Sequence, residues 1–358
     1  MRAAPRSWVG NLAEYVPGRH VDRGPGNLAS NEPPIYGWPS VSRAISDSLE
    51  EIHRYPDPLA DRLRGAVAAD LGLDPNQVLV GNGSDELIFL LCLAYAAGGG
   101  RVVVARPPYR IHALAPAMVG AELEEVPLRQ WRHDLDAMAD VEADLAFVCN
   151  PHNPTGSAVS RAALERFVER ARAGLVVVDE AYVDFATDPA ELSALPLARE
   201  GRCVVLRTMS KLYGIAGLRV GLLLGAEDVI SVLRKARMPF SVGTLAQAGA
   251  LAAWGDRSSA EAVRSYVIGA REELAGLLEE AGLGFLPSEA NFVLAFSSDE
   301  DRLVEWLWER GISVRPGSQL GVPGSVRITV PSPEGMRLLR SALRELPSSL
   351  RGHPPVDH

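Results

Sequence analysis

Short apolar runs alternate with stretches of helical periodicity over the first 240 residues of the 358-residue chain. The runs are rich in valine and leucine, and they occupy residues 77–81, 101–105, 145–149, 175–179, 203–207 and 220–224. Consecutive apolar positions are typical of strands covered on both faces, and their alternation with helices is typical of parallel strands joined by crossover helices. We therefore predict an α/β domain with a mostly parallel central sheet.

The pattern changes after about residue 240. Helical periodicity covers residues 261–282 and 298–311, the apolar segment 290–296 lies between them, and two short extended segments follow at 312–316 and 325–330. This pattern predicts a smaller α+β domain. The domain organisation that we predict is an N-terminal arm that packs with the small domain (1–30), a large domain (31–240), a small domain (241–346) and a flexible tail (347–358).

Composition and charge narrow the class of protein. The chain has 47% hydrophobic residues, 23% charged residues and a net charge of −9, which argues against binding to nucleic acids or anionic membranes. The longest apolar run, 87–97, is shorter than the roughly 20 residues that cross a bilayer, and no signal peptide precedes it. Three cysteines in apolar surroundings, without CxxC spacing, predict buried thiols, a cytoplasmic location and no metal site.

Polar, irregular segments follow the predicted strands. They read "GNGSDE" (81–86), "NPHNPTG" (150–156), "DEAYVDF" (179–185) and "RTMSKLYG" (207–214). Open α/β sheets bind ligands beyond the carboxyl ends of their strands. The chemistry of this protein is therefore expected in these segments.

Lys211 is unusual in this chain. Of 36 basic residues only two are lysines, Lys211 and Lys235. An amine condenses with an aldehyde to form a Schiff base, and a guanidinium does not. Because the basic helical surroundings of Lys235 suggest an ordinary surface residue, Lys211 is the candidate for a Schiff base. If Lys211 carries pyridoxal phosphate, the chain must also supply a phosphate site, a carboxylate for the pyridine nitrogen and donors for the ring oxygen.

A phosphate site is predicted around this lysine. Ser84 and Asp85 stand in a glycine-rich turn that leads into an apolar helix, whose backbone N–H groups favour a phosphate. We expect Asp85 itself to cap this helix. Thr208, Ser210 and Arg219 flank the lysine and complete the predicted phosphate site.

The cofactor ring has its own requirements. Asp179 ends an apolar strand, where a buried carboxylate needs a cationic partner such as a protonated pyridine nitrogen. Tyr182 and Asn153 would donate hydrogen bonds to the ring oxygen, and Tyr109 would lie over the ring face. Each of these residues alone is better explained as part of a turn or of the core, but together they occupy consecutive strand ends.

The ordered segments "NPHNPTG", "VVDEAYVDF" and "TMSKLYGIAGLRVG" resemble those of the fold-type-I pyridoxal-phosphate enzymes, in particular the class I/II aminotransferases. Within this group the chain is most similar to the histidinol-phosphate aminotransferases, through "LAEYVPGR", "LASNEPPIYG", "RYPDP", "GNGSDE", "ISVRP" and "VRIT". The similarity extends from about residue 11 to residue 346. It implies a homodimer that transfers an amino group from a small-molecule donor to a 2-oxo acid.

The resemblance also implies roles for single residues. Lys211 would carry the cofactor, Asp179 would pair with the pyridinium, and Tyr55 of a neighbouring subunit would contact the cofactor phosphate. Arg327 would bind an anionic group of the substrate, with Arg315, Tyr15 and Asn31 near it. "RPPYRIH" (106–112) and "GSQLGVPGS" (317–325) differ from the commonest forms near the substrate.

Other functions share the same cofactor residues. They are transamination of aromatic or specialised amines, decarboxylation of threonine phosphate, and oxidation of arginine. A ligand-sensing domain of a transcription regulator is disfavoured, because only some 30 residues precede "SNEPP" and they contain no helix-turn-helix pattern.

Overall fold

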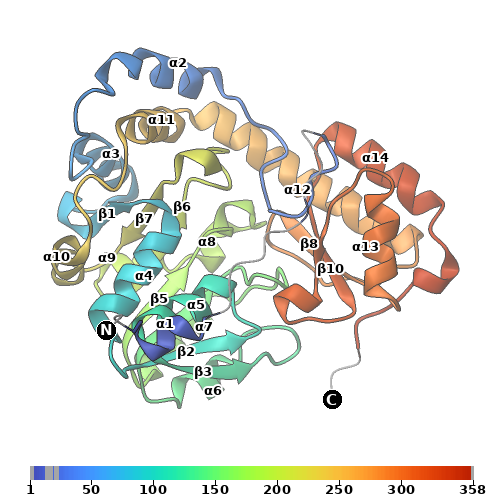
Figure 1. Ribbon diagram of the computed structural model, residues 1–358, viewed down its shortest axis with the longest axis horizontal. Coiled ribbons are helices and arrows are strands. Elements are labelled where there is room, and N and C mark those ends of the chain that lie inside the picture. Colours follow the sequence, from blue (N-terminus) through green and yellow to red (C-terminus); the bar gives the residue numbers. More distant parts are fainter. Residues whose placement is uncertain (1–3, 13–18, 20–23, 356–358) are drawn as a thin grey trace.

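The computed structural model describes residues 4–12, 19 and 24–355. Two sheets organise this part of the chain, one of seven strands in the order β1-β7-β6-β5-β4-β2-β3 and one of three strands in the order β8-β10-β9 (Figure 1). The strands of the large sheet are β1 (Val78–Gly81), β2 (Arg101–Arg106), β3 (Glu122–Pro127), β4 (Ala143–Cys149), β5 (Ala173–Asp179), β6 (Val204–Thr208) and β7 (Gly221–Leu224). The large sheet is mostly parallel, as predicted, and β7 runs antiparallel to both of its neighbours, β1 and β6.

Successive side chains of a central strand point to opposite faces of the sheet, and helices cover both faces. This explains why these runs are apolar at every position. In β4, Leu145 and Phe147 belong to the buried cluster formed with α4 (Gly83–Tyr95), α5 (Arg110–Val119) and α10 (Glu227–Ala236). Ala146 and Val148 belong instead to the cluster on the other face of the sheet. Both faces are covered, so every position in the run is buried.

The edge strand β3 is absent from the prediction. Its sequence is "ELEEVP", it pairs in parallel with β2, and Val126 is its one buried residue. A strand at the edge of a sheet faces water along one side and needs no continuous apolar run. A prediction that relies on continuous apolar runs therefore does not include β3.

The other face of the large sheet is covered by helices from several parts of the chain. They are α2 (Pro39–Asp47), α3 (Asp61–Leu71), α6 (Leu135–Ala139), α7 (Arg161–Arg170), α8 (Pro189–Leu192), α9 (Leu195–Arg199) and α11 (Thr244–Gly255). Helix α11 lies beside α2 in the large domain (Figure 1), and a side chain at Gly249 would meet Leu218 and Ile45. The boundary predicted at residue 240 therefore differs from the packing, which places α11 with the large domain.

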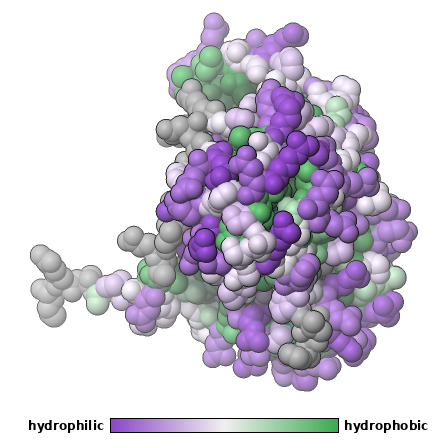
Figure 2. All heavy atoms as spheres, turned by 90° about the vertical axis from the view of Figure 1, so that its right-hand side faces the viewer, coloured by the Kyte–Doolittle hydropathy of each residue, from purple (hydrophilic) through white to green (hydrophobic). Residues whose placement is uncertain are grey.

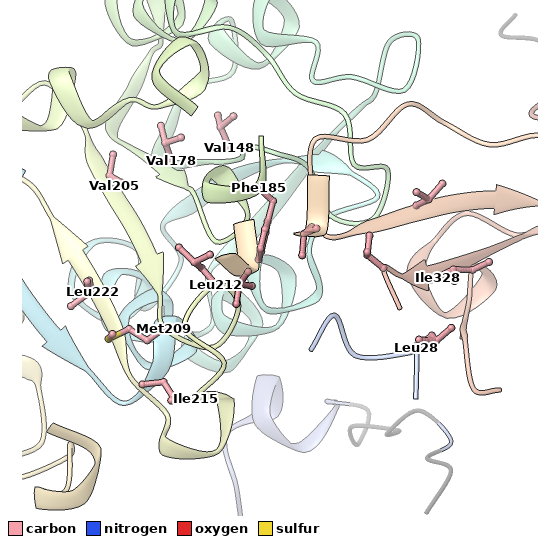
Figure 3. Close-up of a cluster of buried hydrophobic side chains, with 14 of the residues drawn as sticks. Leu28, Val148, Val178, Phe185, Val205, Met209, Leu212, Ile215, Leu222 and Ile328 are labelled. Atoms are coloured by element: carbon pink, nitrogen blue, oxygen red, sulfur yellow. The ribbon is translucent and has the colours of Figure 1, made fainter. Parts of the chain in front are cut away.

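The small domain contains the second sheet and three helices. Its elements are β8 (Phe292–Phe296), β9 (Arg315–Pro316), β10 (Ser325–Thr329), α12 (Arg257–Glu280), α13 (Glu300–Trp308) and α14 (Pro333–Arg344). Helix α12 extends from the large domain into the small one (Figure 1). A single buried cluster joins the two domains, from the valines of β4, β5 and β6 through Phe185 and Leu212 to Ile328 of β10 (Figure 3).

The two ends of the described chain differ from their predicted arrangement. Residues near Leu28 run along the small domain, where the Leu28 N–H donates to the Ser313 carbonyl at 2.9 Å, whereas α1 (Ser7–Gly10) lies against α5 of the large domain. The flexible tail predicted for 347–358 is wrong for residues 348–352. There Leu350 is buried, and the Gly284 N–H donates to the Gly352 carbonyl at 2.7 Å.

The hydrophilic surface and the buried cysteines agree with what the composition predicts. The three cysteines are buried and free, as predicted. The face of the molecule that the small domain presents is mainly hydrophilic (Figure 2). Among the helices in the described ranges, none has the length and apolar character needed to cross a membrane.

Candidate active site

The predicted strand-end segments meet at two adjoining cavities of about 210 and 580 Å³. The smaller cavity is lined by predicted cofactor residues, namely Ser84, Asp85, Tyr109, Asp179, Tyr182, Thr208, Ser210, Lys211 and Arg219. The larger cavity is lined by Asn31, Asn153, Arg315 and Arg327, all of them predicted site residues. Both cavities share Lys211, Tyr182 and Tyr109, so a group held in one lies next to a group held in the other.

Lys211 lies in the turn that follows β6. Its Nζ donates to the Ser30 carbonyl at 3.1 Å and lies 5.8 Å from the centre of the Tyr182 ring. Burial, followed by the positive charge of Arg327, lowers the pKa of the Lys211 amine to about 8. A larger fraction of this amine is therefore neutral near pH 7 than for an ordinary lysine, and the neutral form is the nucleophile.

The first turn of α4 forms the floor of the smaller cavity. Helix α4 starts at Gly83, directly after β1, and Gly83 has a φ of +77°, a conformation that favours glycine. A Cβ on Gly221 of β7 would lie 2.4 Å from the backbone of Gly83 and Ser84. The strand thus packs directly against this turn, and Ser84 and Asp85 of the turn line the smaller cavity. The first N–H groups of a helix have no partner within the helix and favour a phosphate.

The polar side chains around this turn form one connected group. Arg219 Nη1 donates to Ser210 Oγ at 3.4 Å, and Arg219 Nη2 donates to Asp85 Oδ2 at 3.0 Å. Thr208 Oγ1 accepts from the Ser210 N–H at 3.2 Å. Arg219 itself has a φ of +54°, which only a few per cent of non-glycine residues adopt, and this conformation directs its guanidinium toward the cavity.

The helix-capping role expected of Asp85 is wrong. The residue before the helix, Asn82, makes no side-chain capping bond, and its N–H donates to Glu86 Oε2 at 2.5 Å. Asp85 instead accepts from Arg219 and from the Tyr109 hydroxyl at 3.3 Å. Its carboxylate therefore holds the guanidinium and the aromatic ring on the same side of the cavity.

Asp179 is buried at the end of β5 and has a partner that sequence reasoning missed. His112 Nε2 lies 3.1 Å from Asp179 Oδ2, and the Ala181 N–H donates to Asp179 Oδ1 at 3.1 Å. The His112 ring is stacked on Phe147, 4.8 Å between ring centres, which fixes its orientation. The only signal in the sequence is that His112 lies three residues after Tyr109, one helical turn along α5.

Tyr182 lies where three segments of the chain meet. Its hydroxyl oxygen accepts from Asn31 Nδ2 at 3.1 Å and from Asn153 Nδ2 at 3.2 Å. Burial raises the pKa of the Tyr182 hydroxyl to about 12, so the proton stays on the oxygen. Within the described part of the chain this proton has no acceptor, and it is therefore available to an oxygen of a bound group.

Two guanidiniums face the larger cavity from the small domain. Arg315 and Arg327 are direct cross-strand partners on β9 and β10, and they are 8% and 6% exposed. Arg327 Nη1 donates to Asn153 Oδ1 and Arg327 Nη2 to the Ala29 carbonyl, each at 2.8 Å. Two adjacent buried cations give this end of the cavity a positive charge, which is suited to an anionic group.

The wall of the larger cavity includes part of the loop 317–325. Gln319, Leu320 and Gly321 line the cavity, as does Arg110 of α5. The buried carboxylate of Glu300 holds the loop in place by accepting from the backbone N–H of Ser318 at 3.0 Å and of Gly324 at 2.8 Å. Sequence analysis did not identify Arg110, Glu300 or the loop contacts, because these residues meet only in the folded chain.

One of the described predicted residues, Tyr55, does not line the cavities of its own chain. Tyr15 lies outside the described residues. Tyr55 is 82% exposed, stacks on Phe240 at 4.7 Å between ring centres, and lines neither cavity. No group of three or more potential ligand side chains among residues 4–12, 19 and 24–355 is arranged to hold a metal ion.

The residues of the smaller cavity fit pyridoxal phosphate. An amine of lowered pKa, a helix N-terminus beside an arginine, a buried carboxylate and a free phenol proton are the four groups that the aldehyde, phosphate, ring nitrogen and ring oxygen require.

Comparisons with known proteins agree with this geometry. The family model "Aminotransferase class I and II" matches residues 25–343. The chain is 39% identical to the histidinol-phosphate aminotransferase of Geobacillus sp. strain WCH70, over 94% of this chain and 96% of that protein. It is 36% identical to the enzyme of that name from Brevibacillus brevis, over 96% of this chain and 98% of that protein.

A solved structure shows the same fold. It is that of the histidinol-phosphate aminotransferase of Sinorhizobium meliloti in complex with pyridoxal 5'-phosphate, with a TM-score of 0.88 and 27% identity. The similarity covers 96% of this chain and 98% of that one. The fold class predicted from the sequence and the predicted cofactor are both confirmed.

The contact between β7 and the first turn of α4 leads to a stability prediction. Replacing Gly221→Ala should lower the free energy of unfolding by about 1–3 kcal/mol, because the added methyl overlaps the backbone of Gly83 and Ser84. It should also weaken cofactor binding, since that turn would shift. Gly217→Ala is the matched control, because a Cβ there has no neighbour within 4 Å. Equal melting temperatures and equal cofactor affinities for the two variants would contradict this account.

The lowered pKa of Lys211 predicts how cofactor loading depends on pH. The neutral amine attacks the aldehyde, so the loading rate of the apoprotein should rise with pH and be half-maximal at about pH 8. Stopped-flow absorbance after mixing with pyridoxal phosphate measures this rate. Arg327→Gln should move the midpoint upward, because the Arg327 charge is one cause of the lowered pKa. A midpoint near that of free lysine, about 10.4, would contradict the prediction.

Proposed function

Because this chain belongs to the class I and II aminotransferases, we propose that its amino donor is histidinol phosphate and its acceptor 2-oxoglutarate. The products would be imidazole-acetol phosphate and glutamate. The chain is a pyridoxal-phosphate-dependent aminotransferase, and the proposal concerns only the identity of its two substrates. The observation that carries the proposal is the buried pair Arg315 and Arg327 in the cavity that adjoins Lys211.

The anionic groups of the two substrates explain why one site serves both. Arg327 is anchored by Asn153 and by the Ala29 carbonyl, so its planar fork is held in one orientation. A phosphate of the donor and a carboxylate of the acceptor both accept two parallel hydrogen bonds from such a fork. We infer that Arg327 holds both groups in turn, with Arg315 beside it.

The residues of the smaller cavity would hold the cofactor in a fixed orientation. Ser84, Ser210 and Arg219 would hold its phosphate, Asp179 its ring nitrogen and Tyr182 its ring oxygen. When bound, pyridoxal phosphate supplies an aldehyde that accepts the amino group and a ring that delocalises the electron pair left at the substrate Cα. The hydrogen bond between His112 Nε2 and Asp179 Oδ2 holds the Asp179 carboxylate in one orientation.

Lys211 would move the proton. Its amine is at the junction of the two cavities, so it can reach the Cα of a substrate whose anionic end is held by Arg327. An amine with a pKa of about 8 both accepts and returns a proton near neutral pH. Asn31, which donates to Tyr182, would keep the phenol in position while the proton moves.

We further propose that the active enzyme is a homodimer. The exposed large hydrophobic side chains of the described residues all precede residue 241. Tyr55 stacks on one of them, Phe240, and the exposed Leu49, Ile52 and Met238 are near these two residues in the sequence. Tyr55 does not line the cavities of its own chain. A second copy of the chain would cover this patch, and Tyr55 would then extend to the cofactor phosphate of the partner.

A panel of amino donors tests the proposed substrates. Histidinol phosphate, phenylalanine, arginine and threonine phosphate are supplied in turn with 2-oxoglutarate, and glutamate, carbon dioxide and peroxide are measured. We expect fast glutamate formation with histidinol phosphate alone. Fast conversion of phenylalanine would favour an aromatic aminotransferase, and carbon dioxide or peroxide would identify a decarboxylase or an oxidase.

The same assay includes two lysine variants. Lys211→Ala should abolish turnover, and Lys235→Ala, which removes the other lysine at an exposed position, should leave it unchanged. A Lys211→Ala protein that still turned over would refute the assignment of this residue.

Mixing two inactive variants tests the shared active site. A heterodimer of Lys211→Ala and Tyr55→Ala chains contains one intact site, because that site takes Lys211 from one chain and Tyr55 from the other. Random exchange should restore about a quarter of the sites. A mixture of Lys211→Ala and Asp179→Asn chains is the control and should stay inactive, since both residues belong to the same site. No recovery in the first mixture would contradict a contribution of Tyr55 across the interface.

A further inference from the structure

A third cavity, of about 290 Å³, lies away from the proposed active site. It is formed by α6, by α7 and by the turn that joins β3 to α6, and four arginines line it: Arg129, Arg132, Arg166 and Arg170. Helix α6 lies at the opposite end of the large domain from α2 and α11 (Figure 1). The proposed dimer patch around Tyr55 therefore does not extend to it.

The third cavity is lined by more arginines than carboxylates, although the chain as a whole is acidic. The protein has an acidic excess of nine charges, and its exposed arginines commonly find carboxylates, as Arg202 does with Glu165, Glu169 and Glu200. In the third cavity Arg170 pairs with Asp136 at 2.6 Å, and Asp134 accepts from the Ala137 N–H.

The other three arginines of the cavity lack such partners. The side chains of Arg129, Arg132 and Arg166 form no hydrogen bond or ion pair with any residue that the structure describes. Three guanidiniums therefore line this cavity without an ion pair to any described residue, and Asp134 is the carboxylate of the cavity that no arginine pairs with.

The turn that carries two of these arginines is held in an uncommon conformation. Gln130 and Trp131 have φ of +50° and +62°, although neither is glycine. Arg129 and Arg132 exchange backbone hydrogen bonds of 2.9 and 3.1 Å across the turn. Such a conformation persists only where the surroundings enforce it, and here they place Arg129 and Arg132 side by side.

Contacts from two domains enforce this turn. The Trp131 ring packs against Phe296 of β8 at 5.5 Å between ring centres. Ser157 Oγ donates to the Trp131 carbonyl at 2.6 Å. Ser157 belongs to the same loop as Asn153, so the turn beside the cavity is tied to a loop that reaches the active site.

His133 also lines the cavity, and it is 8% exposed. Its Nε2 lies 2.9 Å from the Cys149 carbonyl, which makes Nε2 the protonated nitrogen. Burial lowers the pKa of His133 to about 4, so the ring is neutral and leaves the charge of the cavity to its arginines and carboxylates.

We propose that this cavity binds a small organic phosphate. Three guanidiniums reach the cavity from two separate elements, the turn 129–132 and α7. A planar carboxylate matches a single guanidinium fork, whereas a tetrahedral phosphate presents oxygens in the several directions from which these side chains come. The site is independent of the proposed substrate and would exist whichever amine the enzyme uses.

Binding of inorganic pyrophosphate, glycerol phosphate and citrate to the cofactor-loaded enzyme tests this proposal. Calorimetry is performed on an Arg327→Gln background, which weakens anion binding in the catalytic cavity by removing one of its two buried cations. The double change Arg132→Gln with Arg166→Gln should weaken pyrophosphate binding at least about tenfold, because two charge-assisted partners are lost. Higher salt should weaken the binding of the parent protein as well.

The matched control is Arg302→Gln with Arg337→Gln on the same background. It removes two exposed positive charges from α13 and α14, so it changes the net charge equally, and it should alter the affinity by less than about twofold. The melting temperatures of the two double variants should match that of the Arg327→Gln parent, since the four further side chains that they alter make no hydrogen bond or ion pair within the described chain.

Three outcomes would overturn the proposal. They are absence of pyrophosphate binding by the Arg327→Gln protein, equal weakening by the two double changes, and binding of citrate with neither phosphate compound.

Discussion

The hydroxyl group of Tyr182 is the interaction on which the rest of the site depends. It accepts hydrogen bonds from Asn31, which belongs to the segment before α2, and from Asn153, which follows β4 of the large sheet. Asn153 in turn accepts from Arg327 of the small domain. One oxygen thus links three separate parts of the chain, and the arginine proposed to hold the substrate is positioned relative to the phenol proposed to hold the cofactor.

Burial gives the charges of this site their chemical properties. The Lys211 amine is partly withdrawn from water beside Arg327, which keeps much of it neutral, while burial keeps the Tyr182 proton in place. Asp179 remains a useful partner for a cation because His112 and the Ala181 N–H hold its two oxygens. Few groups of the site act alone, and a change in one would alter the ionisation or the position of the next.

Arginine has two different uses in this protein. In the catalytic cavity, Arg327 is fixed by two acceptors and presents one defined fork to a substrate. At the third cavity, a strained turn and α7 bring together guanidiniums that lack ion pairs in the described chain. Ser157 connects that turn to the loop of Asn153, so a ligand bound there would contact the framework of the active site without entering it.

The sequence by itself determined the strands, the cofactor and most of the residues that line its cavity. Parallel strands place their carboxyl ends at one edge, so Lys211, Asp179 and Tyr182 had to meet once their strands were recognised. Only the tertiary structure decided the contacts that no spacing encodes, such as His112 on Asp179, Glu300 under the cavity loop, and the arginines around the third cavity. These contacts join segments far apart in the chain or depend on backbone conformations that packing enforces, and a linear pattern of residues records neither.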